Sequence, residues 1–174
     1  MKRPLVASVV AAGVFAVGGL ALAGTMQFRS HLETGNEIPT PVNVVGTPAG
    51  DLKLKLSPDG QELRYDLKIT DTITNVLMAH LHLEQNANHT GGIVVWLYPV
   101  GGTAPVLIPG ETDGRLARGV ITPASLVGPL AGPANWDTFL ADIQAGLIYA
   151  NVHTTANPAG EIRDQVHLVL DDED

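Results

Sequence analysis

Cysteine is absent from all 174 residues of the chain. Its absence rules out disulfide bonds, thiolate ligands for a metal ion, and a lipid anchor, which needs a cysteine just after the cleavage point. Basic residues are also scarce, because 10 Lys and Arg stand against 18 Asp and Glu, a formal net charge of −8. We find no basic stripe in the sequence and therefore expect no nucleic-acid partner. The length suits one domain that folds on its apolar core alone.

The first residues have the composition of an export signal. Lys2 and Arg3 precede an apolar run at residues 5–22, and this run ends in the small-residue pattern Ala-Leu-Ala. We expect a signal peptide over residues 1–23 and a mature single domain over residues 24–174, periplasmic or extracellular and free of the membrane. A transmembrane anchor is the alternative, although the run is short for a bilayer and lacks a basic stop-transfer cluster.

Short runs of alternating apolar and polar residues fill the rest of the chain, separated by Gly, Pro, Asn and Asp. This pattern is typical of an antiparallel β-sandwich or β-barrel, so we predict an all-β fold. The clearest hairpin joins residues 52–56 to residues 62–69 through the turn at residues 57–60. Residues 93–98 are apolar on both faces, which predicts a central strand covered on both sides.

One short helix is expected within the all-β fold, at about residues 135–146. Asn135 can cap its start, and Gly146 can end it. The last strand is expected over residues 161–170. The acidic tail that follows, residues 171–174, is interpreted as a solvated terminus.

Two histidines one residue apart, His80 and His82, are the most informative feature of the sequence. Side chains at positions i and i+2 of a strand share a face, with Cα atoms roughly 6.5–7 Å apart. A third histidine, His153, lies in another strand-like segment. If the strands bring the three together, their imidazoles can hold a copper or zinc ion, with ligand atoms about 3–4.5 Å apart. The alternative is a structural role, in which the imidazoles bond to backbone carbonyls.

Two further residues are candidates for the same site. His89, in the loop after the first two histidines, is a weaker candidate for a fourth ligand, because loop histidines are usually solvated. Asn151 precedes His153 on the same face of its strand. It can orient the imidazole of His153, or it can cap the neighbouring turn at Asn157.

A charged group near the end of the chain also has two interpretations. Arg163 is expected to pair with Glu161 or Glu37, which would tie the last strand to the first segment. In the functional alternative, Arg163 guides an anion toward a metal held by the histidines.

Four stretches of the chain share the pattern of one known family. They are residues 28–41 (FRSHLETGNEIPTP), 79–82 (AHLH), 91–97 (GGIVVWL) and 146–165 (GLIYANVHTTANPAGEIRDQ). Together they resemble the CHRD domain, the module named after chordin that also occurs in exported bacterial and archaeal proteins. The resemblance implies an all-β domain but no settled activity. Because chordin binds growth-factor ligands outside the cell, it also allows an extracellular protein or surface as partner.

The sequence departs from this family at one position. Asp164 stands where the family usually has Gly, at a position whose alternation points inward. A carboxylate there needs a bulge, a solvent-facing stretch, or a partner such as Arg163 or a backbone N–H.

We interpret the chain as an exported CHRD-domain binding module whose partner is a metal ion or an extracellular protein or surface. The alternative is a mononuclear copper redox enzyme, because an HxH strand on a β-sandwich is similar to the copper–zinc superoxide dismutases. The chain lacks the cysteine pair of those enzymes and their dense run of bridging His and Asp. We assign no catalytic residue.

Overall fold

The computed structural model describes residues 26–169. The expected signal peptide and the acidic tail therefore lie outside the described residues. The elements are β1 (Gln27–Glu33), β2 (Ala49–Leu56), β3 (Leu63–Leu83), β4 (Ile93–Tyr98), β5 (Ile108–Ile121), α1 (Trp136–Gln144), β6 (Ile148–Thr154), β7 (Ile162–Gln165) and β8 (His167–Val169), with 3-10 turns at Thr34–Asn36, Pro123–Ser125, Gly128–Leu130 and Pro133–Asn135.

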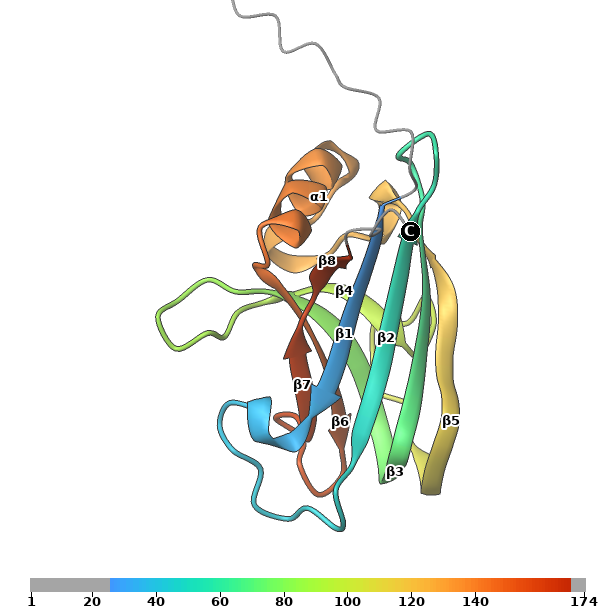
Figure 1. The fold of residues 1–174 in the computed structure, drawn as a ribbon, viewed down its shortest axis with the longest axis vertical. Helices are drawn as coiled ribbons and strands as arrows, with labels where there is room; N and C mark the ends of the chain where they lie inside the picture. The colour runs from blue at the N-terminus through green and yellow to red at the C-terminus, as the bar shows by residue number, and fades with distance from the viewer. Residues whose placement is uncertain (1–25, 170–174) are drawn as a thin grey trace, which may run out of the picture.

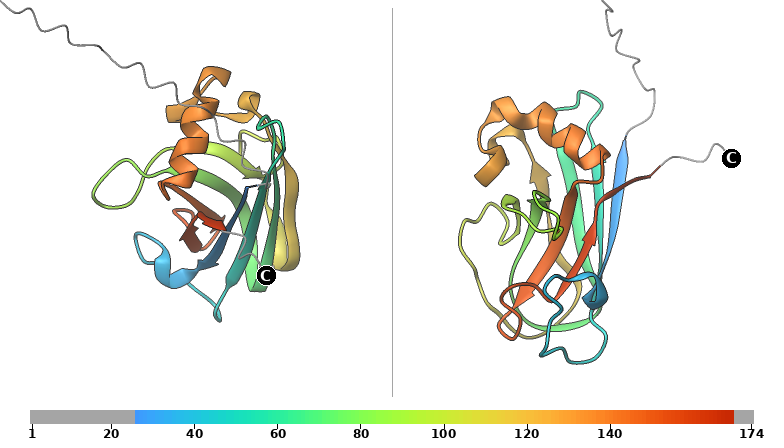
Figure 2. Two further views of the ribbon diagram at one scale, coloured as in Figure 1. Left: turned by 45° about the horizontal axis from the view of Figure 1, so that its top comes forward. Right: turned by 90° about the vertical axis from the view of Figure 1, so that its left-hand side faces the viewer.

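The strands form a closed antiparallel β-barrel, which confirms the prediction of an all-β fold (Figure 1). Around the ring the order is β2, β1, β7, β6 and β3, and β3 closes the ring by pairing with β2. β3 is 21 residues long and serves two parts of the barrel. Its first half pairs with β2 and β5, and its second half pairs with β6 and β4. Figure 2 shows the strands around the interior from two other directions.

The β2–β3 hairpin forms where the sequence predicts it. Leu52 and Leu54 of β2 are buried and lie opposite Leu67 and Tyr65 of β3, while the lysines between the leucines are exposed. Burial of each such leucine contributes about 1.5–3 kcal/mol to folding. The apolar-polar alternation therefore sets both the register of the hairpin and the side that faces the core.

Helix α1 lies over the upper end of the barrel in Figure 1. Trp136 and Phe139 are buried in the core, and the indole N–H of Trp136 donates to the carbonyl of Gly60 in the β2–β3 turn at 2.7 Å. The predicted cap is wrong, because the Asn135 side chain donates back to the carbonyl of Ala131 instead. Gly146 follows the helix with φ +71°, a conformation that favours glycine, as expected.

Two strand predictions need correction. Within residues 26–169, β4 pairs with β3 alone and is not a central strand. Its other edge is covered by a non-strand segment, since the carbonyl of Val94 accepts the N–H of Val127 at 2.9 Å. The strand expected over residues 161–170 is divided into β7 and β8 at Val166. A strand that is apolar on both faces can thus be an edge strand when loops cover it.

Asp164 lies where the pairing of β1 passes from β7 to β8. Its carboxylate accepts the backbone N–H of His31 at 3.2 Å and the side-chain amide of Asn36 at 3.4 Å. The backbone partner that the sequence required for this carboxylate is therefore present. The Asp164 carboxylate takes the backbone N–H of His31, which a backbone carbonyl would accept in a regular sheet, and this accounts for the break between the two short strands.

Exposed basic residues gather on the outer face of β2, β3 and β5. The register places Lys55 opposite Arg64, and Lys68 opposite Arg115. Acidic residues lie among them, since Lys53 pairs with Asp66 and Lys68 pairs with Asp51. The face is therefore mixed in charge, and the exclusion of nucleic-acid partners stays a prediction. The exposed cations of the three strands are Lys53, Lys55, Arg64, Lys68, Arg115 and Arg118.

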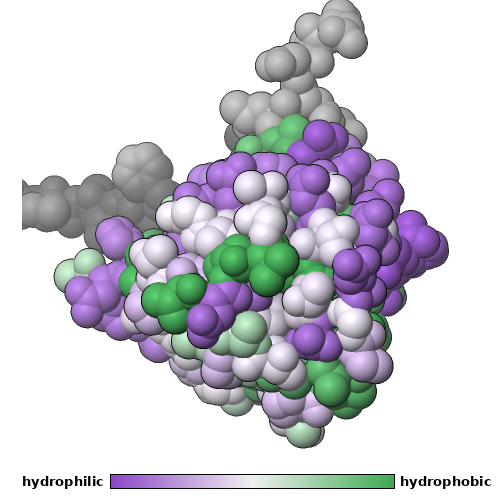
Figure 3. Space-filling model, turned by 90° about the horizontal axis from the view of Figure 1, so that it is seen from below, coloured by the Kyte–Doolittle hydropathy of each residue, from purple (hydrophilic) through white to green (hydrophobic). Residues whose placement is uncertain are grey.

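The surface at the lower end of the barrel is mixed. Figure 3 shows small apolar patches there between hydrophilic side chains. Scattered apolar side chains of this kind are ordinary on a folded domain. No helix within residues 26–169 is long and apolar enough to cross a membrane.

Candidate metal centre

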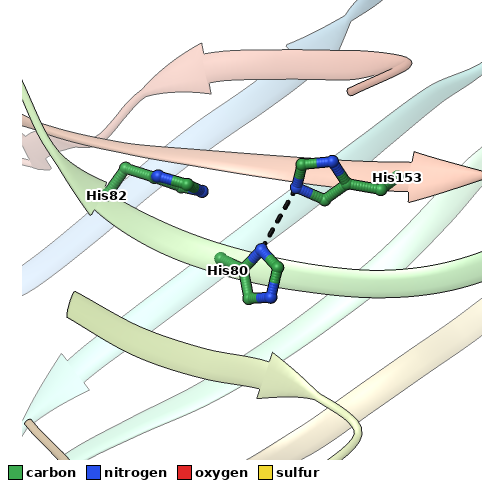
Figure 4. A group of neighbouring side chains, drawn as sticks. All are labelled: His80, His82 and His153. Atoms are coloured by element: carbon green, nitrogen blue, oxygen red, sulfur yellow. Dashed lines mark hydrogen bonds between the residues drawn. The ribbon is translucent and has the colours of Figure 1, made fainter. Parts of the chain in front are cut away.

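The three predicted histidines come from two neighbouring strands. His80 and His82 lie on β3 and His153 lies on β6, in the register that pairs His153 with Met78 (Figure 4). Ala79, which precedes His80, and Leu81, which lies between His80 and His82, belong to the apolar core. The histidines therefore lie on the opposite, outer face of the sheet. Even so, their exposed fractions are only 0%, 8% and 5%. Loops outside the barrel therefore cover this face.

The structure brings the three imidazoles together. One ring nitrogen from each residue can be chosen so that all three lie within 4.8 Å of one another. His80 Nδ1 is 3.1 Å from His153 Nε2. Two nitrogens bound tetrahedrally to one zinc ion lie about 3.3 Å apart, so this pair already has the required separation. The bound of 4.8 Å on the whole set is slightly wider than the range expected from the sequence.

Backbone carbonyls determine which ring nitrogens carry protons. His82 Nδ1 lies 3.0 Å from the carbonyl of Gly91, and His153 Nδ1 lies 3.1 Å from the carbonyl of Pro158. Because a carbonyl only accepts, both Nδ1 atoms must donate, and both Nε2 atoms keep their lone pairs. Histidine ligands of metal ions are commonly oriented by this type of bond.

His80 Nε2 and His82 Nε2 are buried and make no hydrogen bond to any residue in the described part of the chain. Buried polar atoms in folded proteins almost always have a partner. A structural role explains the Nδ1–H bonds of His82 and His153 to carbonyls, but it leaves these two nitrogens unexplained.

Burial keeps the imidazoles neutral. It lowers the pKa of His80 to about 2, with His153 and His82 adding to the effect, and it lowers the pKa of His153 to about 4. Burial likewise lowers the pKa of His82, against the opposing effect of the bond to Gly91. At neutral pH each imidazole is therefore neutral and has one unprotonated ring nitrogen, the form that binds a metal ion.

Gly91 is a residue of the site that the sequence did not identify as such. A Cβ on Gly91 would overlap the carbonyl oxygen of Leu83, so only glycine lets the loop approach β3 closely enough to reach His82. The Gly91-Gly92 pair was the available signal, but it suggested only a turn.

Two aromatic rings also hold the histidines. Tyr149 stacks on His82 with ring centroids 4.8 Å apart and planes inclined by 6°. Trp96 meets His80 edge to face at 4.3 Å. Both are cross-strand neighbours of these histidines, so only the strand register could have revealed them.

Of the two remaining candidates, Asn151 contacts the histidine cluster and His89 does not. Asn151 is buried, and its side-chain Oδ1 lies 3.0 Å from His153 Nε2, so Asn151 contacts the candidate centre. His89 lies apart from the cluster, exposed at the surface and bonded through Nδ1 to a Glu84 carboxylate oxygen at 2.6 Å.

The expected ion pairs of Arg163 are not formed. No carboxylate within residues 26–169 lies close enough to form an ion pair with its guanidinium. Glu161 instead accepts hydrogen bonds from Thr154 and Asn157, and Glu37 accepts the backbone N–H of Ile38. The guanidinium carbon of Arg163 lies 3.5 Å from the centre of the Tyr149 ring.

Fold and site together define a small β-barrel domain with a candidate mononuclear histidine centre on the covered outer face of its sheet. The family model of the CHRD domain matches residues 28–166, and the chain belongs to this family. The matched range includes all three histidines and the two loops that orient them. Comparison with curated proteins and with solved structures gave no match.

Proposed function

We propose that this CHRD domain binds one transition-metal ion, copper or zinc, through His80, His82 and His153. The observation that carries the proposal is that one ring nitrogen from each of the three buried imidazoles converges to within 4.8 Å, with Nδ1 of His82 and of His153 held by backbone carbonyls. Three neutral imidazoles without a thiolate form a donor set that suits either metal.

Binding without turnover is favoured over redox catalysis. The three histidines are almost fully buried, whereas a catalytic ion needs an open position that a substrate can reach. We further propose that the domain is exported, to the periplasm or the cell exterior, where its partner is the metal ion or an extracellular protein or surface. The N-terminal sequence supports export.

The test is metal content and affinity of the purified protein, measured by elemental analysis and by titration after chelation. We expect one ion per chain, and its loss in both His80→Gln and His153→Gln. His89→Gln is the matched control, and it should keep the ion because His89 lies outside the cluster. Absence of stoichiometric copper or zinc, or equal affinity in all three variants, would overturn the proposal. Superoxide or peroxide turnover by the copper-loaded protein would favour the enzyme alternative.

A further inference from the structure

Arg163 is a buried cation that forms no ion pair with any carboxylate of residues 26–169. Its exposed fraction is 4%. Nη2 donates to the carbonyl of His89, and Nη1 makes no hydrogen bond to any residue between 26 and 169. A buried guanidinium normally has a carboxylate or another anion beside it, because an uncompensated charge is costly to remove from water.

Arg163 lines a pocket of about 210 Å³ beside the histidine face, together with Ile38, Gln165 and the two acids Glu84 and Asp164. Both acids are already engaged. Glu84 bonds to His89 and to the amide nitrogen of Gln165, and Asp164 bonds to groups of β1 and the following turn. Among the described residues the guanidinium therefore has no ion-pair partner, and an anion in this pocket would supply one.

We propose that this pocket binds a small monocarboxylate, held by the guanidinium of Arg163. A carboxylate has two oxygens at the spacing of the guanidinium N–H groups, and Nη1 still has both of its hydrogens free to donate. The acids Glu84 and Asp164 repel a dianion more strongly than a monoanion. Ile38, with an exposed fraction of 40%, supplies an apolar wall for a short alkyl group.

The carboxylate site is distinct from the metal centre. The Tyr149 ring contacts both sites, since it stacks on His82 and also lies under the Arg163 guanidinium. Arg163 reaches the carboxylate from β7, whereas the metal ligands lie on β3 and β6. Binding of the anion is therefore expected in the chelated protein as well as in the metal-loaded protein, and failure of one proposal leaves the other standing.

The test is a titration of the full chain, as purified and after chelation, with acetate, propanoate, phosphate and chloride, followed by calorimetry and by NMR of the Arg and Gln side-chain N–H groups. Acetate and propanoate should bind saturably and shift these signals, and chloride should not. Tighter binding of phosphate than of acetate would overturn the assignment to a monocarboxylate. A response to acetate no larger than that to chloride would overturn the site itself.

Two substitutions locate the site. Ile38→Asp places a negative charge at the pocket and should weaken acetate binding by at least about tenfold. Val42→Asp is the matched control in the same loop, because Val42 is 85% exposed and does not line the pocket. Arg163→Lys, checked for folding by circular dichroism, should weaken binding similarly through loss of the guanidinium fork. Equal acetate affinity in Ile38→Asp and Val42→Asp would contradict the proposal.

Discussion

At the residue scale, Glu37 shows how the covered face alters ordinary ionisation. Burial raises the pKa of Glu37 from 4.5 to about 7, against smaller opposing effects of the Ile38 N–H and of Arg163. Its Oε2 has no hydrogen-bond partner in the part of the chain that the structure describes. Gly160 makes room for this carboxylate, because a Cβ there would overlap it.

Replacement of Glu37 by Gln should change how stability depends on pH. The folded-state pKa lies above the unfolded value, so the folded state holds the extra proton and the stabilisation is lost as pH rises through 7. Gln cannot ionise, so the free energy of unfolding of Glu37→Gln should rise relative to that of the parent by up to about 3 kcal/mol between pH 5 and pH 8. Urea unfolding at the two pH values measures this difference. Parallel pH profiles of parent and variant would contradict it.

Asn151 should matter for affinity rather than for the number of ions bound. It contacts His153 Nε2 but is not one of the three candidate metal ligands. Loss of a group that orients a ligand usually weakens metal binding by about 10–100-fold. Asn151→Ala should show this loss in a competition titration with one ion still bound, whereas the control Asn135→Ala, next to helix α1, should match the parent. An unchanged affinity in Asn151→Ala would show that the amide does not support the centre.

At the element scale, the loop between β3 and β4 orients the centre through one carbonyl. Gly91→Ala would push the loop away from Leu83 and break the bond to His82 Nδ1, so metal affinity should fall by at least about tenfold. Gly35→Ala is the matched control, because a Cβ there meets no atom within 4 Å. Competition titration of both variants measures the effect. Equal affinities would mean that the loop does not hold the imidazole.

Helix α1 should stabilise the barrel without affecting the site. Phe139 is fully buried, and its replacement by Ala should cost about 3–5 kcal/mol of unfolding free energy. The helix packs at the end of the barrel, while the histidines lie on the outer face of β3 and β6. Phe139→Ala should therefore lower stability in urea unfolding and still bind one ion with the parent affinity. A large loss of affinity in a folded variant would show that the two regions are coupled.

The sequence predicts those elements whose patterns are local. Alternation over residues 52–69 was enough for the β2–β3 hairpin, and Gly146 marked the end of the helix. The sequence could not predict that β4 is an edge strand, because its free edge is covered by a loop from a distant part of the chain. The division at Val166 depends on Asp164 reaching β1, which is also a tertiary contact.

At the scale of the whole molecule, composition conceals how charge is distributed. The chain carries a formal net charge of −8, but its exposed cations gather on the outer face of β2, β3 and β5. The histidine face lies on a different part of the barrel, on the second half of β3 and on β6. Alternation within each strand, combined with the register between strands, places these cations beside Asp51 and Asp66 on one outer face, an arrangement that net charge cannot predict.

The candidate centre could be predicted from the sequence only in part. The spacing of His80 and His82 places them on one face, and a third histidine on another strand suggested a shared site. The carbonyls of Gly91 and Pro158 that fix the ring protons belong to loops that close over the sheet only in the folded barrel. No local pattern encodes that closure.

Anomalous diffraction at the copper and zinc absorption edges, from crystals of the metal-loaded protein, tests the central claim most directly. The account predicts one strong peak at about 2.0–2.1 Å from a ring nitrogen of each of His80, His82 and His153. His31 with Asp51 and His89 with Glu84 are exposed pairs that could also attract an ion. A peak at either surface pair, with none among the three buried imidazoles, would contradict the account.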